Sequence, residues 1–198
     1  MEFLNTNLPY ILAGISVGGQ YALIAIGYTM VYGILRLINF AHGDIFMVAG
    51  FAMVYLSATL PLYISIPLTI IITVLLGFAV ERMAYKPLRT APRMSIMISA
   101  IGVSYLLQNC AWYITSGLAK QYPTIPWISE SISIGTATTK IVTVITPILT
   151  IVLVIALVIL IKYTKIGMAM RAMAKDFETS QLMGVKINSV ISFTFIIG

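Results

Sequence analysis

The chain alternates between long apolar blocks and short polar connections, and the blocks have the lengths of helices that cross a bilayer. A bilayer core of about 30 Å needs roughly 20 apolar residues in helical form. Residues 3–35 form the first block, and residues 45–80 carry no charge over a length that suits two spans joined by a turn. Pro61 and Pro67 are expected to mark that turn.

Two further blocks, residues 94–114 and 141–161, each match one span, and a sixth opens at about Val190 and is still apolar at Gly198. The pattern predicts an all-α, polytopic membrane protein with about five complete transmembrane helices and the start of a sixth. We expect residues 1–198 to form a single transmembrane domain that is incomplete at its C-terminal side. The five expected spans are residues 3–35, 44–60, 62–80, 94–114 and 141–161.

The basic residues predict the orientation of these spans, because connections rich in Lys and Arg stay on the cytoplasmic side. Of the 12 basic residues, only Lys120 and Lys140 lie in connections after the second or fourth span. The other ten follow the first, third or fifth span. We therefore expect the N-terminus outside, with loops 82–93 and 162–189 in the cytoplasm.

Composition excludes several classes of protein. With 60% hydrophobic and 9% charged residues, the chain cannot cover a water-facing surface, and nucleic-acid binding is not expected. One cysteine and one histidine exclude a disulfide framework and an all-protein zinc site. The sequence has no G-x-x-x-x-G-K-[ST] phosphate loop, so nucleotide hydrolysis would need another chain. We expect no catalytic residue, metal or cofactor.

A polar cluster formed by Arg36, Asn39, His42 and Asp44 interrupts the apolar first part of the chain. Ionisable groups near membrane depth are costly and usually face a partner, a cavity or a pathway. One alternative is a short loop in which Asn39 or Asp44 caps the next helix. Another is a broken or re-entrant helix inside the protein. A hydrolytic role for His42 and Asp44 would need a nucleophile beside them, and the sequence offers only scattered serines.

Gly14 and Gly18 form a GxxxG step just before Gln20. Small residues four apart let two membrane helices approach closely, so helix packing is the main interpretation of this step. The alternative, that this stretch lines a pathway, rests on the polar side chain of Gln20.

The long connection 162–189 contains a segment, residues 167–185, with the spacing of one short amphipathic helix. Charges of both signs lie among its apolar residues, and Gly184 is expected to end it. Mixed charge suits a groove on a protein better than anionic lipid, which favours a uniformly basic face. The alternative is an amphipathic linker that rests on the membrane.

Three stretches carry a resemblance to a known family: residues 21–44, which end in Asn39-Phe-Ala-His-Gly-Asp44, then Arg171-Ala-Met-Ala-Lys-Asp176 and Leu182-Met-Gly-Val185. The chain closely resembles permease subunits of branched-chain amino-acid (LIV-type) ABC importers. The resemblance implies a multi-pass protein of the cell (inner) membrane that forms the translocation pathway by alternating access. It also implies two cytoplasmic ATP-binding subunits, a second permease subunit and an extracytoplasmic substrate-binding protein as partners.

The resemblance also assigns roles to residues. It implies a translocation path or gate at Asn39, His42 and Asp44, and Gln20 is added to these candidates on the strength of its polar side chain alone. It implies an ATPase-coupling surface formed by Arg171, Ala172, Ala174, Asp176, Phe177, Leu182 and Gly184. The alternative function is a membrane-embedded enzyme or assembly factor that uses His42 and Asp44.

Overall fold

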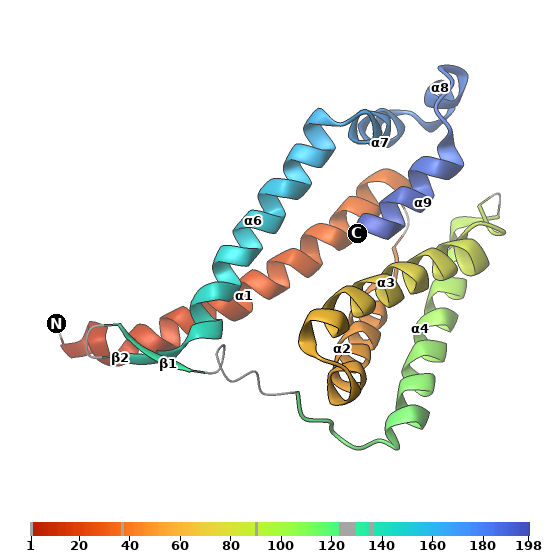
Figure 1. The fold of residues 1–198 in the computed structure, drawn as a ribbon. Coiled ribbons are helices and arrows are strands. Elements are labelled where there is room, and N and C mark those ends of the chain that lie inside the picture. The colour runs from red at the N-terminus through yellow and green to blue at the C-terminus, as the bar shows by residue number, and fades with distance from the viewer. Residues whose placement is uncertain (1, 37, 90, 123–129, 135–136) are drawn as a thin grey trace. The chain divides into compact units, whose positions relative to one another are not determined.

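The computed structural model describes the whole chain except residues 1, 37, 90, 123–129 and 135–136. The described part is mainly helical (Figure 1). Its elements in chain order are α1 (Glu2–Leu35), α2 (His42–Thr59), α3 (Leu62–Val80), η1 (Glu81–Tyr85), α4 (Arg93–Thr115), β1 (Ser131–Ile134), β2 (Ala137–Lys140), α6 (Ile141–Tyr163), α7 (Lys165–Lys175), α8 (Phe177–Leu182) and α9 (Ile187–Ile197).

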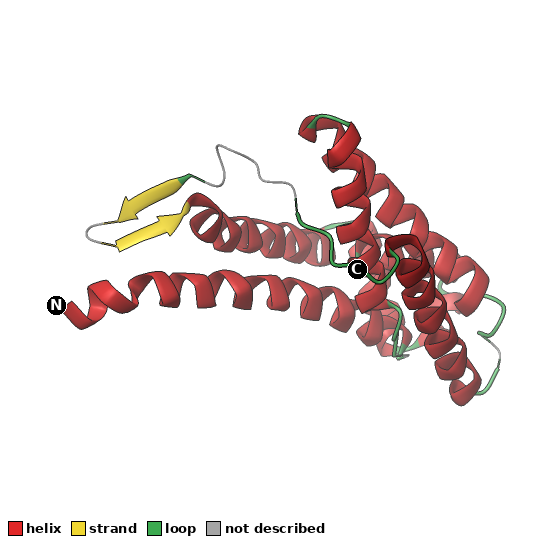
Figure 2. Ribbon diagram, turned by 90° about the horizontal axis from the view of Figure 1, so that it is seen from below, coloured by secondary structure: helices red, strands yellow, loops and turns green. Residues whose placement is uncertain are grey.

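The chain divides into two compact units, and residues 1–26 with 124–168 make up the first. In this unit the beginning of α1 lies beside α6 (Figure 2). A Cβ added at Gly19 would lie 3.1 Å from the hydroxyl oxygen of Thr150, so a glycine lets the two helices approach closely here. Strands β1 and β2 pair antiparallel just before α6. The sequence analysis did not predict this hairpin.

The second unit comprises residues 27–123 and 169–198. Here α2 packs against both α3 and α4, and α9 packs against α3 and η1. Gly77 permits the contact between α3 and α9, because a Cβ at this position would lie 3.1 Å from the carbonyl oxygen of Phe195.

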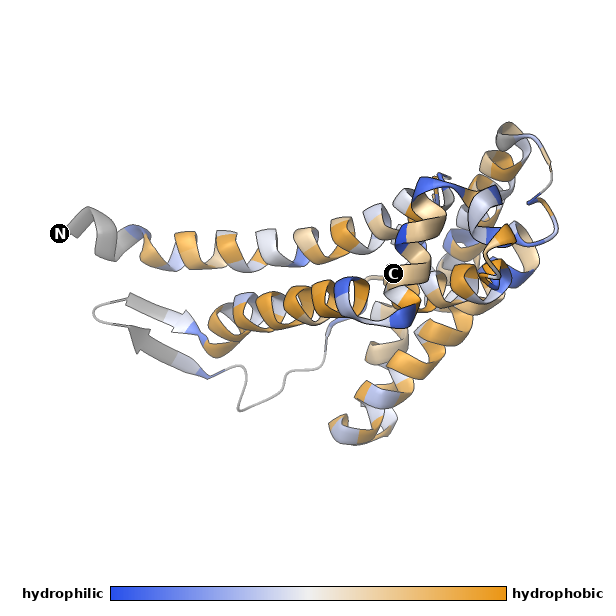
Figure 3. Ribbon diagram, turned by 90° about the horizontal axis from the view of Figure 1, so that it is seen from above, coloured by the Kyte–Doolittle hydropathy of each residue, from blue (hydrophilic) through white to orange (hydrophobic). Residues whose placement is uncertain are grey.

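The predicted class, a polytopic all-α membrane protein, is confirmed. Within the described residues, four helices are long and apolar enough to cross a membrane, and their apolar character is visible in Figure 3. Helix α2, the expected second span, forms but does not join these four, because His42 and Asp44 in its first turn lower its hydropathy. The four are Asn7–Ile34, Leu62–Tyr85, Met94–Thr115 and Ile141–Tyr163.

Helix α3 ends at Val80, the expected end of the third span, but the candidate membrane span extends to Tyr85. The helix continues for five residues as the π-helix η1, with the Lys86 N–H donating to the Glu81 carbonyl over 2.9 Å. The charge of Glu81 does not end the helix, because the carboxylate is paired within the protein. Of the two prolines expected at the preceding turn, Pro61 is the N-cap of α3 and Pro67 lies inside the helix.

The turn between α6 and α7 depends on Gly167. A Cβ at this position would overlap the carbonyl oxygens of Leu160 and Ile161, which are backbone atoms and cannot rotate away. We expect Gly167→Ala to lower the free energy of unfolding by about 1–3 kcal/mol, the usual cost of overpacking. Thermal unfolding of the purified protein, followed by tryptophan fluorescence, measures the change. Gly102→Ala in α4 is the control, because a Cβ added there would meet no neighbouring atom within 4 Å among the described residues, apart from the backbone of its own helix. An equal midpoint for both variants would contradict the prediction.

Candidate functional site: a polar cluster at the inner helix ends

The polar cluster begins where α1 ends. Arg36 has a positive φ of 55°, a left-handed conformation that residues other than glycine rarely adopt, and its N–H donates to the Tyr32 carbonyl over 2.8 Å. The chain then crosses to α2, which begins at His42 with Ala41 as its N-cap residue. The two helices are therefore joined by a short connection rather than by a continuous or re-entrant helix.

Asn39 lies at the centre of this connection and is 3% exposed. Its side-chain oxygen accepts two hydrogen bonds, from the Ala41 N–H over 3.1 Å and from the Tyr85 hydroxyl over 2.8 Å. The first bond lies just before α2, whose N-cap residue is Ala41 without a side-chain cap, so neither Asn39 nor Asp44 is the N-cap that the loop alternative expected. The second bond, to the end of η1, could not be read from the sequence.

His42 and Asp44 occupy the first turn of α2 and have different neighbours. The imidazole of His42 meets the ring of Tyr28 edge-on, with 5.9 Å between ring centroids. The carboxylate of Asp44 is buried and accepts a hydrogen bond from the Gln108 amide over 3.0 Å. The same amide also donates to the Ser104 hydroxyl over 3.1 Å. Asp44 therefore connects α2 to α4 and lies at the helix N-terminus, where a negative charge is stabilised.

Gln20 and the other three pathway candidates belong to different compact units. Gln20 is exposed on α1 in the first unit, whereas Asn39, His42 and Asp44 belong to the second. The neighbouring glycines Gly14 and Gly18 have no atom within 4 Å of an added Cβ, among the residues that the structure describes. Their predicted role in close helix packing therefore has no counterpart there.

The sequence analysis missed Glu81. This side chain has no exposed surface, although it lies within one of the four apolar helices. Its carboxylate forms an ion pair with Arg89 and accepts a hydrogen bond from the Ser192 hydroxyl over 3.0 Å, and Arg89 also bonds to Asn188. One sign of this ion pair is present in the sequence: an acidic residue directly follows a charge-free run, and an arginine lies two helical turns after it.

The prediction of one amphipathic helix over residues 167–185 was also wrong. Two helices, α7 and α8, occupy this region, and they meet at Asp176, which has an extended backbone. The Asp176 carboxylate accepts hydrogen bonds from the N–H groups of Glu178 and Thr179 over 3.0 and 3.1 Å. An aspartate with this geometry is an N-cap, so it starts a new helix instead of continuing the old one. Gly184 ends α8 with a positive φ of 84°, as expected.

The hydrogen bonds at this cap lower the pKa of the Asp176 carboxyl, with the largest effect from the Thr179 hydroxyl and a smaller one from backbone N–H groups. A carboxyl whose pKa is lower in the folded state stabilises the fold above its unfolded pKa of about 3.9. This stabilisation is lost as the pH falls through the lowered value. The cap is therefore fully formed at neutral pH.

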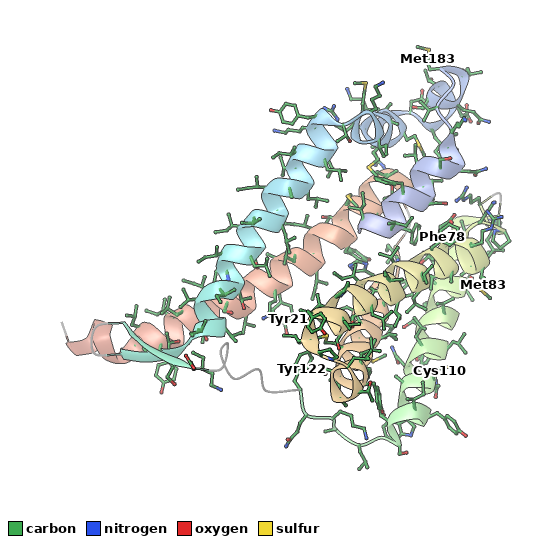
Figure 4. The ribbon with its side chains drawn as sticks, viewed as in Figure 1. Tyr21, Phe78, Met83, Cys110, Tyr122 and Met183 are labelled. Carbon is green, nitrogen blue, oxygen red and sulfur yellow. The ribbon has the colours of Figure 1, made fainter. Side chains whose placement is uncertain are left out.

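The apolar residues of α7 and α8 face in two directions. Met170 and Met173 are buried in the protein, with 1% and 3% of their surface exposed. Phe177 is partly exposed, whereas Leu182 and Met183 lie almost fully in the open, and Figure 4 shows Met183 at the tip of the turn after α8. One set of apolar residues therefore packs the segment into the protein, and another set is exposed.

A hollow of about 450 Å³ lies beside the junction of α7 and α8. The end of α1 contributes Arg36, whose guanidinium donates to the Ala174 carbonyl over 3.3 Å. Ala174 is half-buried, while Arg171 on the same helix is exposed and Ala172 is half-buried. The other lining residues are Tyr32, Ile34, Met173, Lys175 and Phe177. Of the expected coupling residues, Ala174 and Phe177 line this hollow, beside the basic side chains of Arg36 and Lys175.

Comparisons with known proteins identify the family of this chain. Residues 10–198 match the family described as branched-chain amino acid transport system, permease component. The chain is 35% identical to the high-affinity branched-chain amino acid transport system permease protein BraD of Pseudomonas aeruginosa. It is 36% identical to LivH of Salmonella typhimurium and 35% identical to LivH of Escherichia coli, which carry the same description.

Each of these alignments covers 96% of this chain and 66% of the relative, so the chain spans just under two thirds of their length. No solved structure matches. The fold defines a multi-pass membrane protein, and the chain belongs to the family of permease components of branched-chain amino-acid transport systems. This family membership disfavours the enzyme or assembly-factor alternative built on His42 and Asp44, because the relatives are transport permeases rather than enzymes.

The cap at Asp176 gives a direct test of the break between α7 and α8. Asp176→Ala removes the acceptor, so the amide hydrogens of residues 177–182 should exchange faster with solvent. Asp176→Asn keeps a side-chain oxygen and should retain most of the protection. Hydrogen exchange of the intact protein, read by mass spectrometry, compares the two variants. Unchanged protection in the alanine variant would mean that α8 does not need this cap.

Proposed function

We propose that the chain is the permease subunit of an ATP-driven importer that carries branched-chain or related amino acids across the cell membrane. The observation that carries this proposal is the family match, which extends over residues 10–198 and includes the polar cluster. The expected partners are two cytoplasmic ATP-binding subunits, a second permease subunit and an extracytoplasmic substrate-binding protein. The lipid bilayer surrounds the assembly.

The mechanism we propose is alternating access. Closure of the two ATPases on ATP would displace the α7–α8 segment, and the helices would switch between outward-facing and inward-facing arrangements. The basic connections support a cytoplasmic position for that segment, where ATP is present. The free energy of ATP hydrolysis would reach this chain through packing contacts with the ATPases, and no chemical step would take place on the chain itself.

Asn39, His42 and Asp44 are proposed to line the translocation path or its inner gate, with Gln20 as a further candidate. An amino acid carries an ammonium group, and a carboxylate is the natural partner for it on an otherwise apolar route. Asp44 fits this role because it is buried and its hydrogen-bond partner, Gln108, is a neutral amide. Its negative charge is therefore not cancelled by that partner.

The Asp44 proposal predicts a loss of transport without a loss of protein. Asp44→Ala and Asp44→Asn should reduce uptake roughly tenfold or more, because each removes one charge-assisted interaction of about 1.5–3 kcal/mol. The amount of protein in the membrane should stay near normal. Uptake of radiolabelled amino acid by liposomes that contain the whole importer, with its binding protein, measures this.

Ser57→Ala is the control, since it removes a hydroxyl from the same helix that bonds only within α2. Normal uptake by both Asp44 variants would refute the pathway role, and no uptake by the unmodified importer would refute the proposed function itself.

The coupling surface we propose consists of Arg171, Ala172, Ala174, Asp176, Phe177, Leu182 and Gly184. Leu182 is its sharpest probe because it is 88% exposed and contributes little to the fold. Ala174 is less suitable, since its carbonyl accepts a bond from Arg36. We expect Leu182→Glu to weaken ATPase docking roughly thirtyfold, the effect of about 2 kcal/mol for a carboxylate left unpaired in an apolar contact.

Co-purification of the ATPases with the intact permease measures this docking. Leu118→Glu is the matched control, because Leu118 is also exposed but lies in the connection predicted on the opposite side of the membrane. If the Leu182→Glu variant keeps its ATPases and transports normally, α8 lies outside the contact.

A further inference from the structure

The last turn of the third span differs from an ordinary helix end. Glu81–Tyr85 is a π-helix, a form that is rare and often found at functional sites. Two of its three polar side chains, Glu81 and Tyr85, are four residues apart and are 0% and 3% exposed. Arg82 and Met83 between them are exposed, and Met83 points outward in Figure 4. The turn therefore buries a carboxylate and a phenol on one face of the helix.

The carboxylate end of this turn is tied to α9. Glu81 is paired with Arg89 and accepts the Ser192 hydroxyl over 3.0 Å, and Arg89 is bonded to Asn188. Asn188 and Ser192 both lie on α9, which begins at Ile187, only a few residues after α8 ends. A displacement of the α7–α8 segment would thus reach η1 through α9.

The phenol end of the same turn is tied to the polar cluster. The Tyr85 hydroxyl donates to the Asn39 side-chain oxygen over 2.8 Å, and this oxygen also accepts the Ala41 N–H at the start of α2. The Tyr85 ring also contacts the ring of Phe195 on α9, with 5.1 Å between centroids. One tyrosine therefore links α9 to the residue that orients the first turn of α2.

We propose that η1 relays movement of the α7–α8 segment to the Asn39–Asp44 cluster, with Glu81 and Tyr85 as positioning residues. The inference rests on the proposed function and names the internal path of its coupling. Stability alone does not require such a network, because apolar side chains of similar volume often stabilise a core as well as a buried ion pair does. Buried hydrogen-bonded groups instead require a defined geometry, and they exchange between discrete arrangements rather than deforming smoothly.

Tyr85→Phe tests the relay with a minimal change, because it removes the hydroxyl and keeps the ring on Phe195. The variant should assemble with its ATPases and hydrolyse ATP, but the amount of amino acid transported per ATP should fall roughly tenfold. A tenfold change corresponds to about 1.4 kcal/mol, the scale of one buried hydrogen bond. Tyr63→Phe is the matched control, since Tyr63 lies at the opposite end of the same span and is 76% exposed.

A double-mutant cycle tests whether the two ends of η1 act together. Ser192→Ala should also lower transport per ATP, and Ser192→Thr should restore it by returning a hydroxyl. If the contacts act in series, Tyr85→Phe with Ser192→Ala should be little worse than the more severe single variant. Additive losses, or normal coupling in Tyr85→Phe, would overturn the relay.

A second measurement separates failure of the relay from failure of the proposed function. Hydrogen exchange at residues 39–45 is compared with the ATPases bound and removed, first in the unmodified permease and then in Tyr85→Phe. A response in the unmodified protein that disappears in the variant supports the relay. The same response in both proteins overturns the relay and leaves the proposed function intact. If the ATPases do not bind the unmodified permease, the proposed function is wrong and the relay falls with it.

Discussion

A charge with no exposed surface has to be paired inside the protein, and Glu81 imposes this constraint on the second unit. Its carboxylate pairs with Arg89 from the following connection and accepts a hydrogen bond from Ser192 of α9. These two segments must therefore both lie against the end of α3. The same turn presents Tyr85 to Asn39, which in turn supports the start of α2. The packing of α9 and the geometry of the polar cluster thus both follow from where one carboxylate is buried.

The helices of this protein could largely be predicted, because a charge-free run of about 20 residues has few folds available to it in a bilayer. Helix α6, expected over residues 141–161, runs from Ile141 to Tyr163. Hydropathy fails where the partner of a charged residue decides whether a helix continues. At Glu81 the helix continues because distant side chains neutralise the charge, and at Asp176 it breaks because the carboxylate bonds the next two N–H groups. Neither pairing can be read from hydropathy.

The candidate site could likewise be predicted only in part. Asn39, His42 and Asp44 could be identified from the sequence because polar groups are conspicuous within an apolar stretch. Their partners could not, since Tyr85 is one of 11 tyrosines and nothing in its neighbourhood distinguishes it. A tyrosine is also compatible with lipid, an interface or a core, so its role depends on a contact 46 residues away in sequence. Gln20 belongs to a different compact unit from the other candidates, a division that hydropathy does not reveal.

The α7–α8 segment is held in place by packing and also keeps apolar residues exposed, two requirements that one set of residues cannot meet. An amphipathic helix normally uses all its apolar residues on one face, which leaves nothing for a second contact. The break at Asp176 separates the two tasks, because Met170 and Met173 anchor α7 while Leu182 and Met183 remain exposed beyond the cap. Exposed apolar side chains beside basic ones such as Lys175 are costly in water unless something covers them. The capped break therefore fixes the segment through α7 and leaves the apolar residues at the end of α8 exposed, as the proposed ATPase contact requires.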